Sequence, residues 1–151
     1  MTDGTFQKVD TSDKRLYGPP GILFCGYAVG EHRPLADALE QIGFGDRTIV
    51  FVTGADADKR VKEVLAYPDR SGMGQPSDLA RATIMSGFTQ QEVHRLMNAY
   101  RQAGLPPQLW ATLTPVSEGW TVAALLQELA AEAVAFRQKQ AGEKRGPDGG
   151  K

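Results

Sequence analysis

The sequence predicts an α/β fold: a tandem βαβα repeat that forms a four-stranded, mostly parallel sheet of strand order 2-1-3-4, with helices on both faces. Three observations support this prediction. The chain is similar to itself at a spacing of 61 residues, the interval from Gly26 to Gly87. Short apolar runs rich in strand formers recur along it, and segments with apolar residues at helical spacing follow them. Strands that alternate with helices are typical of βαβ units.

The self-similarity needs no gap on either side of the two glycines. The identical pairs at this spacing are Gly26/Gly87, Glu31/Glu92, Leu35/Leu96, Ala38/Ala99, Gln41/Gln102, Gly43/Gly104, Thr53/Thr114, Val61/Val122 and Leu65/Leu126. Self-similarity at a fixed period indicates two copies of one structural unit.

The first copy contains two predicted strands and two predicted helices. Ile22–Cys25 is a continuous apolar run, which is typical of a strand buried on both faces. Apolar residues at helical spacing then predict a helix that ends at Gly43. Thr48–Thr53 is rich in β-branched residues and predicts the second strand. Asp56 stands where it could cap the second helix.

The second copy has the same order. Ala82–Phe88 and Leu109–Thr114 are its predicted strands, and residues 90–103 its first helix. Ser117 is expected to cap the last helix, which outruns its counterpart and reaches Phe136.

A pseudo-two-fold along the strand direction would put the first strands of the two copies side by side at the centre of the sheet. Two alternatives remain open: one edge strand runs antiparallel, or two chains exchange elements across the long linker. The predicted boundaries are a flexible N-terminal tail (1–18), one α/β domain (19–137) made of repeat one (20–67), a linker (68–81) and repeat two (82–137), and a disordered tail (138–151).

Composition narrows the classes of partner. The 17 Lys and Arg balance 18 Asp and Glu, so no net positive field attracts nucleic acid. No apolar stretch is long enough to cross a membrane, and the polar N-terminus does not read as a signal peptide. With a single cysteine, Cys25, no internal disulfide forms, and we expect a cytoplasmic protein.

A ligand crevice is expected where the first strands of both copies end, because open α/β sheets bind ligands at a switch point between strands. Its residues would be Cys25, Gly26, Tyr27, Ser86, Gly87 and Phe88. The alternative explanation is structural: glycine suits a strand-to-helix turn, and the aromatic rings close the end of the core.

No arrangement in the sequence predicts a catalytic residue, a metal site or a cofactor. Cys25 follows three apolar strand residues, which is typical of an inert buried thiol. The phosphate-binding, dinucleotide-binding and nucleophile-elbow motifs are absent from the sequence.

The last helix offers a possible interface. Four of its residues fall on one side and run beyond the length that the repeat needs: Leu125, Leu129, Ala133 and Phe136. A second subunit could cover them, or the N-terminal segment could, with Phe6 and Leu16.

The second copy also carries a set of motifs: Gly87-Phe88, Gly104, Ala111 with Thr114, and Trp120. In these residues it resembles an uncharacterised bacterial domain-of-unknown-function family, DUF3783-like, mainly over residues 82–132. The first copy departs from the pattern, with Val50, Gly54 and Lys59 where the second has Ala111, Pro115 and Trp120. The resemblance implies no reaction, substrate or site residue.

These observations favour a non-catalytic protein-interaction or regulatory module that self-associates as a homodimer or binds an unidentified protein. The alternative is a binding protein for a small anionic metabolite, or a small enzyme, with its site at the carboxyl ends of the first and third strands. The sequence does not decide whether the protein is an enzyme, and it favours a protein without enzymatic activity.

Overall fold

A four-stranded sheet forms the centre of the protein. The computed structural model describes residues 14–149. The strands are β2 (Gly21–Cys25), β3 (Thr48–Val52), β4 (Ala82–Ser86) and β5 (Leu109–Thr112), in the order β3-β2-β4-β5. Because β2 is the first of these four strands along the chain and β3 the second, this is the predicted order 2-1-3-4. We call residues 20–67 the first half and residues 82–137 the second half.

The direction of the central pair differs from the expectation. β2 pairs with β3 in parallel, and β4 with β5 in parallel, so the sheet is mostly parallel as predicted. At the centre, β2 and β4 run antiparallel, with Leu23 opposite Ile84. The pseudo-two-fold therefore stands perpendicular to the sheet instead of along the strands. Leu23 and Ile84 are 61 positions apart, so this axis passes between equivalent residues.

The path of the linker explains the antiparallel centre. Ser71 forms a parallel bridge with Val50, so the chain runs beside β3 in the direction of β3. It then passes against Gly26, at the carboxyl end of β2, before β4 begins at Ala82. β4 thus starts at the end of the sheet where β2 finishes.

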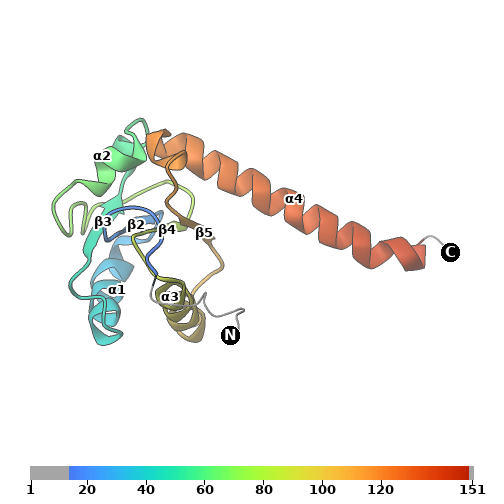
Figure 1. Ribbon diagram of the computed structural model, residues 1–151, viewed down its shortest axis with the longest axis horizontal. Helices are drawn as coiled ribbons and strands as arrows, with labels where there is room; N and C mark the ends of the chain where they lie inside the picture. The colour runs from blue at the N-terminus through green and yellow to red at the C-terminus, as the bar shows by residue number, and fades with distance from the viewer. Residues whose placement is uncertain (1–13, 150–151) are drawn as a thin grey trace.

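Helices cover both faces of the sheet, as predicted. α1 (Val29–Gln41) and α3 (Gln90–Gln102) lie on one face, and α2 (Val61–Leu65) and α4 (Val122–Gly149) on the other (Figure 1). Alternate residues of each strand point to opposite faces, so every strand contributes to both cores. The first core contains Ile22, Phe24, Leu39, Ile49, Phe51, Met85, Val93 and Leu96. The second contains Leu23, Val50, Val52, Val61, Val64, Ile84, Val122 and Leu125.

A short 3₁₀ turn follows the outer strand of each half: η2 (Gly54–Asp56) and η3 (Ser117–Gly119). The expected caps belong to these turns and not to the helices. Asp56 accepts a hydrogen bond from the Thr53 amide at 3.0 Å, and Ser117 one from the Thr114 amide at 3.0 Å. The helices begin later, at caps of their own: the Arg60 amide donates to Glu63 Oε1 at 2.9 Å before α2, and Thr121 Oγ1 accepts from the Ala124 amide at 3.1 Å at the start of α4.

The two halves also meet above the sheet. The Val61 amide donates to the Trp120 carbonyl at 2.9 Å, and the Val122 amide donates to the Lys59 carbonyl at 2.9 Å. The two bonds are equivalent, because Val61 and Val122 are 61 positions apart and so are Lys59 and Trp120. A two-fold axis between Leu23 and Ile84 relates one bond to the other.

The structure describes part of each predicted tail. Residues 14–18 are attached to the sheet, since the Leu16 amide bonds the Phe88 carbonyl at 2.7 Å and the Gly87 amide bonds the Tyr17 carbonyl at 3.0 Å. α4 continues beyond Phe136 to Gly149 and projects from the body of the molecule past the β5 side of the sheet (Figure 1). In residues 14–149, no helix has the length and apolar character to cross a bilayer.

Candidate functional site

The six crevice residues do not come together. In the antiparallel centre Cys25 lies opposite Ala82, and Ser86 lies opposite Gly21. The Gly-aromatic turn after β2 and the one after β4 are therefore at opposite ends of the sheet. A single crevice between them requires parallel β2 and β4, which the linker path rules out.

Each of the two turns is closed by the chain itself. Gly26 and Gly87 have positive φ values of 74° and 70°, a conformation that glycine adopts without strain. A Cβ atom on Gly26 would lie 2.3 Å from the Leu79 carbonyl oxygen, and one on Gly87 would lie 2.7 Å from the Gly18 carbonyl oxygen. The close approach that a ligand could have used is occupied by backbone at both ends.

The side chains of the crevice prediction are core residues. Cys25 has no exposed surface, and burial raises the pKa of its thiol to about 12, with Asp56 adding to the shift. Ser86, Tyr27 and Phe88 are buried as well. A thiol that stays protonated and out of contact with solvent is a poor nucleophile.

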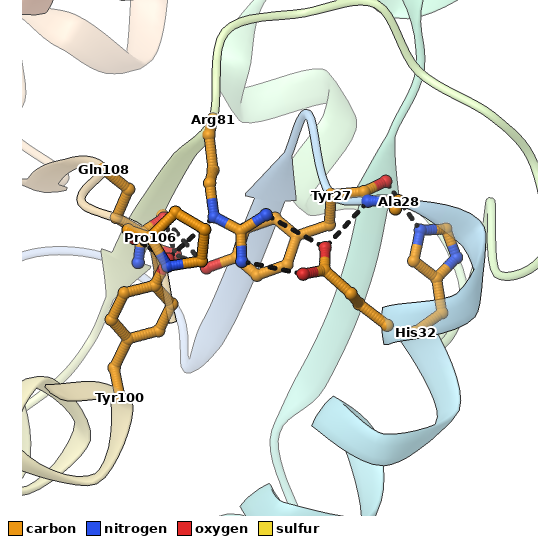
Figure 2. Close-up of polar contacts among 9 residues, drawn as sticks. Tyr27, Ala28, His32, Arg81, Tyr100, Pro106 and Gln108 are labelled. Atoms are coloured by element: carbon orange, nitrogen blue, oxygen red, sulfur yellow. Dashed lines mark hydrogen bonds and ion pairs between the residues drawn. The ribbon is translucent and has the colours of Figure 1, made fainter. Parts of the chain in front are cut away.

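A polar network does form at the carboxyl end of β2, around the buried ring of Tyr27 (Figure 2). The Tyr27 hydroxyl donates to Gln108 Oε1 at 2.8 Å and lies 2.9 Å from Thr83 Oγ1. Burial raises the pKa of this phenol well above its usual range. The hydroxyl is therefore a neutral hydrogen-bonding group that ties the start of β5 to β4.

Glu31 and Arg81 form the charged part of the same network. Arg81 donates to both carboxylate oxygens, at 2.9 and 3.1 Å, and its Nε donates to the Tyr100 hydroxyl at 2.7 Å. Its guanidinium also lies 4.1 Å from the centre of the Tyr27 ring. The hydrogen bond from Arg81 holds the pKa of Glu31 below its usual range. The fork of Arg81 is thus taken up by partners within the chain.

His32 belongs to this end too, and the sequence analysis did not single it out. The residue is buried, and its ring stacks on Phe51 at 4.2 Å between centroids. The Gly74 amide donates to Nδ1 at 2.9 Å, so Nδ1 is an acceptor and Nε2 carries the proton toward the Tyr27 carbonyl at 3.2 Å (Figure 2). Its long-range partner Gly74 is in the linker, and nothing near His32 in the sequence signals it.

A second ion pair lies at the opposite end of the sheet. Arg47 donates to Glu92 at 2.6 Å, and its guanidinium lies 5.1 Å from the ring centres of both Phe44 and Phe88. Burial raises the pKa of Glu92, but the hydrogen bonds from Arg47 and the Thr89 amide, together with the positive charges of Arg47 and Arg15, outweigh it, so the net shift is downward. Arg47 is only 7% exposed, so this is the more buried of the two pairs.

Most polar side chains at the two ends bond one another, although Arg47 Nη1, Ser86 Oγ and Gln108 Nε2 are buried without a hydrogen-bond partner among the described residues. The titratable side chains with large shifts are hydrogen-bonded within the network or sealed in the core. Among the described residues, no group of three or more His, Cys, Asp and Glu side chains could hold a metal ion. The arrangement can orient backbone and strands, and it presents no nucleophile beside a base.

The predicted interface on α4 splits in two. Leu125 is buried in the core under α4, and Leu129 packs against that core. Ala133 is half-buried and Phe136 is 61% exposed, beyond the end of the sheet. The other predicted cover for these α4 residues was the N-terminal segment. Leu16 of that segment does not cover them, because it packs on the opposite face of the sheet. Phe6 lies outside the described residues.

Comparison with known proteins adds one match. Residues 81–136 match the family described as Domain of unknown function (DUF3783), which confirms the resemblance over this segment. The match begins one residue before β4 and ends within α4, so it covers the second half alone. No curated protein and no solved structure matches the chain.

Proposed function

Starting from a family match that assigns no activity, we propose that the protein is a non-catalytic, cytoplasmic interaction module that self-associates. The observation that carries the proposal is the apolar side of α4 defined by Leu125, Leu129, Ala133 and Phe136, which we call the α4 stripe. Its first two members pack on the sheet, and its last two continue past the sheet with Phe136 61% exposed. A large apolar side chain exposed where such a stripe continues onto a projecting helix is typical of a subunit interface.

The two ends of the sheet support the non-catalytic part of the proposal. The crevice residues are separated, and the chain's own backbone fills the space next to each glycine. Cys25, the single cysteine of the sequence, is buried with a raised pKa. The near-neutral charge balance, 17 basic against 18 acidic residues, disfavours nucleic acid as the partner.

The proposal also takes residues 19–137 as one domain built from two copies of a βαβα unit. The matching order of elements in the two halves supports this, as do the exchanged bonds between Val61, Trp120, Val122 and Lys59.

Sedimentation velocity of the full chain over a range of concentrations tests self-association. Phe136→Glu puts a charge on the α4 stripe and is expected to weaken the oligomer by about tenfold or more, since burial of a phenylalanine contributes about 1.5–3 kcal/mol. Gln138→Glu is the matched control, because it adds the same charge to an exposed position on the opposite side of the same helix.

A full chain that stays monomeric at every concentration contradicts the proposal. So does an oligomer that Phe136→Glu and Gln138→Glu weaken equally, because the effect would then come from the charge and not from the stripe.

A further inference from the structure

The two outer strands of the sheet differ in how their free edges are treated. The outward amides of β3 are bonded by the linker: Ile49 N–H donates to Asp69 Oδ1 at 2.9 Å, and Phe51 N–H donates to the Ser71 carbonyl at 2.8 Å. The Arg70 amide also bonds the Ile49 carbonyl at 2.6 Å. The edge of β3 is therefore closed.

The corresponding edge of β5 is open in the part of the chain that the structure describes. The amides of Leu109 and Leu113 bond the Arg81 and Met85 carbonyls on the β4 side, at 3.1 and 2.9 Å. Alternate peptide groups of a strand face opposite ways, so those of Trp110 and Thr112 face away from β4. These two are the equivalents of Ile49 and Phe51. No described residue bonds their amides, and no described strand lies beyond β5.

Nothing in the composition of β5 hinders pairing. Proteins protect open edges with charged side chains, or with proline inside the strand. Residues 105–117 contain no Asp, Glu, Lys or Arg, and the prolines of this segment lie outside Gln108–Thr114. An uncharged edge of this kind is a template for another strand.

We propose that β5 pairs antiparallel with β5 of a second copy of this chain, so that the four strands of each copy form one continuous sheet. This inference rests on the proposed self-association and names its surface. Antiparallel pairing of two identical strands places the two-fold perpendicular to the sheet, so helices of the same kind share a face. The junction of β2 with β4 joins the two halves of one chain in the same way.

The position of α4 favours a second copy over an isolated extended peptide. α4 lies against β5 and projects outward beyond it, over the place where the next copy would sit (Figure 1). A peptide added to the edge would satisfy Trp110 and Thr112 but leave Phe136 exposed. A second copy at this edge covers both, since each α4 then extends over the other molecule.

Two measurements on the full chain test this edge. The first is hydrogen exchange of the Trp110 and Thr112 amides, which should slow by about tenfold or more as the protein is concentrated into the dimer. The second is sedimentation velocity of Thr112→Pro, which removes the outward N–H without touching a bond to β4. Thr112→Val keeps the amide and is the matched control. We expect Thr112→Pro to abolish the dimer and Thr112→Val to retain it.

The outcomes separate this inference from the proposed function. A dimer that Phe136→Glu weakens, while the two amides exchange freely and Thr112→Pro has no effect, overturns the edge pairing and leaves self-association standing. Amides protected equally at all concentrations overturn it as well, because another part of the same chain would then cover the edge. Should Thr112→Pro fail to fold, the exchange measurement on the unaltered chain still decides.

Discussion

β3 and β5 end the sheet on its two sides, and they occupy equivalent places in the two halves. β3 is buried along four of its five residues and bonded along its edge by residues 69–71, whereas β5 is half-buried throughout. The difference arises in the helix that follows each strand. α2 ends at Leu65, shortly before Pro68, and the chain then returns along β3. The position equivalent to Pro68 is Leu129, and α4 continues through it.

One proline therefore separates a half with a covered edge from a half with an open one. Proline cannot continue a helix, because it lacks the amide and its ring clashes with the preceding turn. Without it, α4 leaves the sheet as a long projecting helix, and no segment within residues 14–149 returns to cover the edge of β5. Two units of similar sequence thus acquire different edges: the linker closes that of the first, and the described residues leave that of the second unbonded.

The largest expected effect comes from pushing the linker off β3. Gly72 has a φ of 80°, and a Cβ atom there would lie 2.0 Å from the Phe51 carbonyl oxygen. Gly72→Ala should lower the free energy of unfolding by about 4 kcal/mol, through backbone strain and lost edge bonds. Gly74→Ala, at φ 86° with open space around it, should cost about 1 kcal/mol. Urea unfolding measures both, and equal losses would show that the linker does not stabilise β3.

The next largest effect is expected from the ion pairs at the two ends of the sheet, which should contribute unequally to the free energy of unfolding. Glu92→Gln leaves Arg47 buried without its partner and should cost about 3 kcal/mol, whereas Glu31→Gln should cost about 1 kcal/mol because Arg81 and Glu31 are more exposed. Urea unfolding of the two variants at neutral pH makes the comparison. A larger loss for Glu31→Gln would reverse this ranking of the two ends.

Acidification should weaken the same two contacts. The folded-state pKa of both Glu31 and Glu92 is lowered from about 4.5, so their contribution is present above that pH and is lost as the pH falls through the folded values. The midpoint temperature of thermal unfolding, measured from pH 7 to pH 3, should decrease once the pH drops below about 4.5. The fall should be shallower in Glu92→Gln, since one of the two carboxylates no longer titrates. An unchanged slope would mean that other groups dominate the acid transition.

The smallest effect on stability, and the simplest test of the inert core, concerns Cys25. A rise of its pKa from 9.0 to about 12 lowers the thiolate fraction about a thousandfold, and the sulfur has no exposed surface. A thiol reagent at pH 8 should label the folded protein only as fast as it unfolds, and label it promptly in denaturant. Ser86→Cys at the equivalent position, with Cys25 replaced by Ala, should behave alike. Rapid labelling of folded protein in either case would show that its end of the sheet opens.

Much of the fold could be predicted from local patterns. The apolar runs at Ile22–Cys25 and Thr48–Thr53 are typical of strands that are buried on both faces. The predicted bounds of these strands therefore agree with the observed ones to within a residue or two. The 61-residue repeat carried that assignment into the second half and predicted the strand order. The candidate site was harder, because its partners are remote in sequence: Glu31 meets Arg81, and His32 meets Gly74.

The sequence by itself determined the α/β class, the strands and helices in their order, and the pair of helices on each face, because periodicity in a short segment reports which side is buried. Only the tertiary structure decided that β2 and β4 run antiparallel, that their turns lie at opposite ends, and that the described part of the chain leaves the edge of β5 unpaired. Those features depend on where residues 66–81 and the continuation of α4 travel in space. Their paths are set by hydrogen bonds between remote segments, such as Ser71 to Phe51, and no local pattern encodes such bonds.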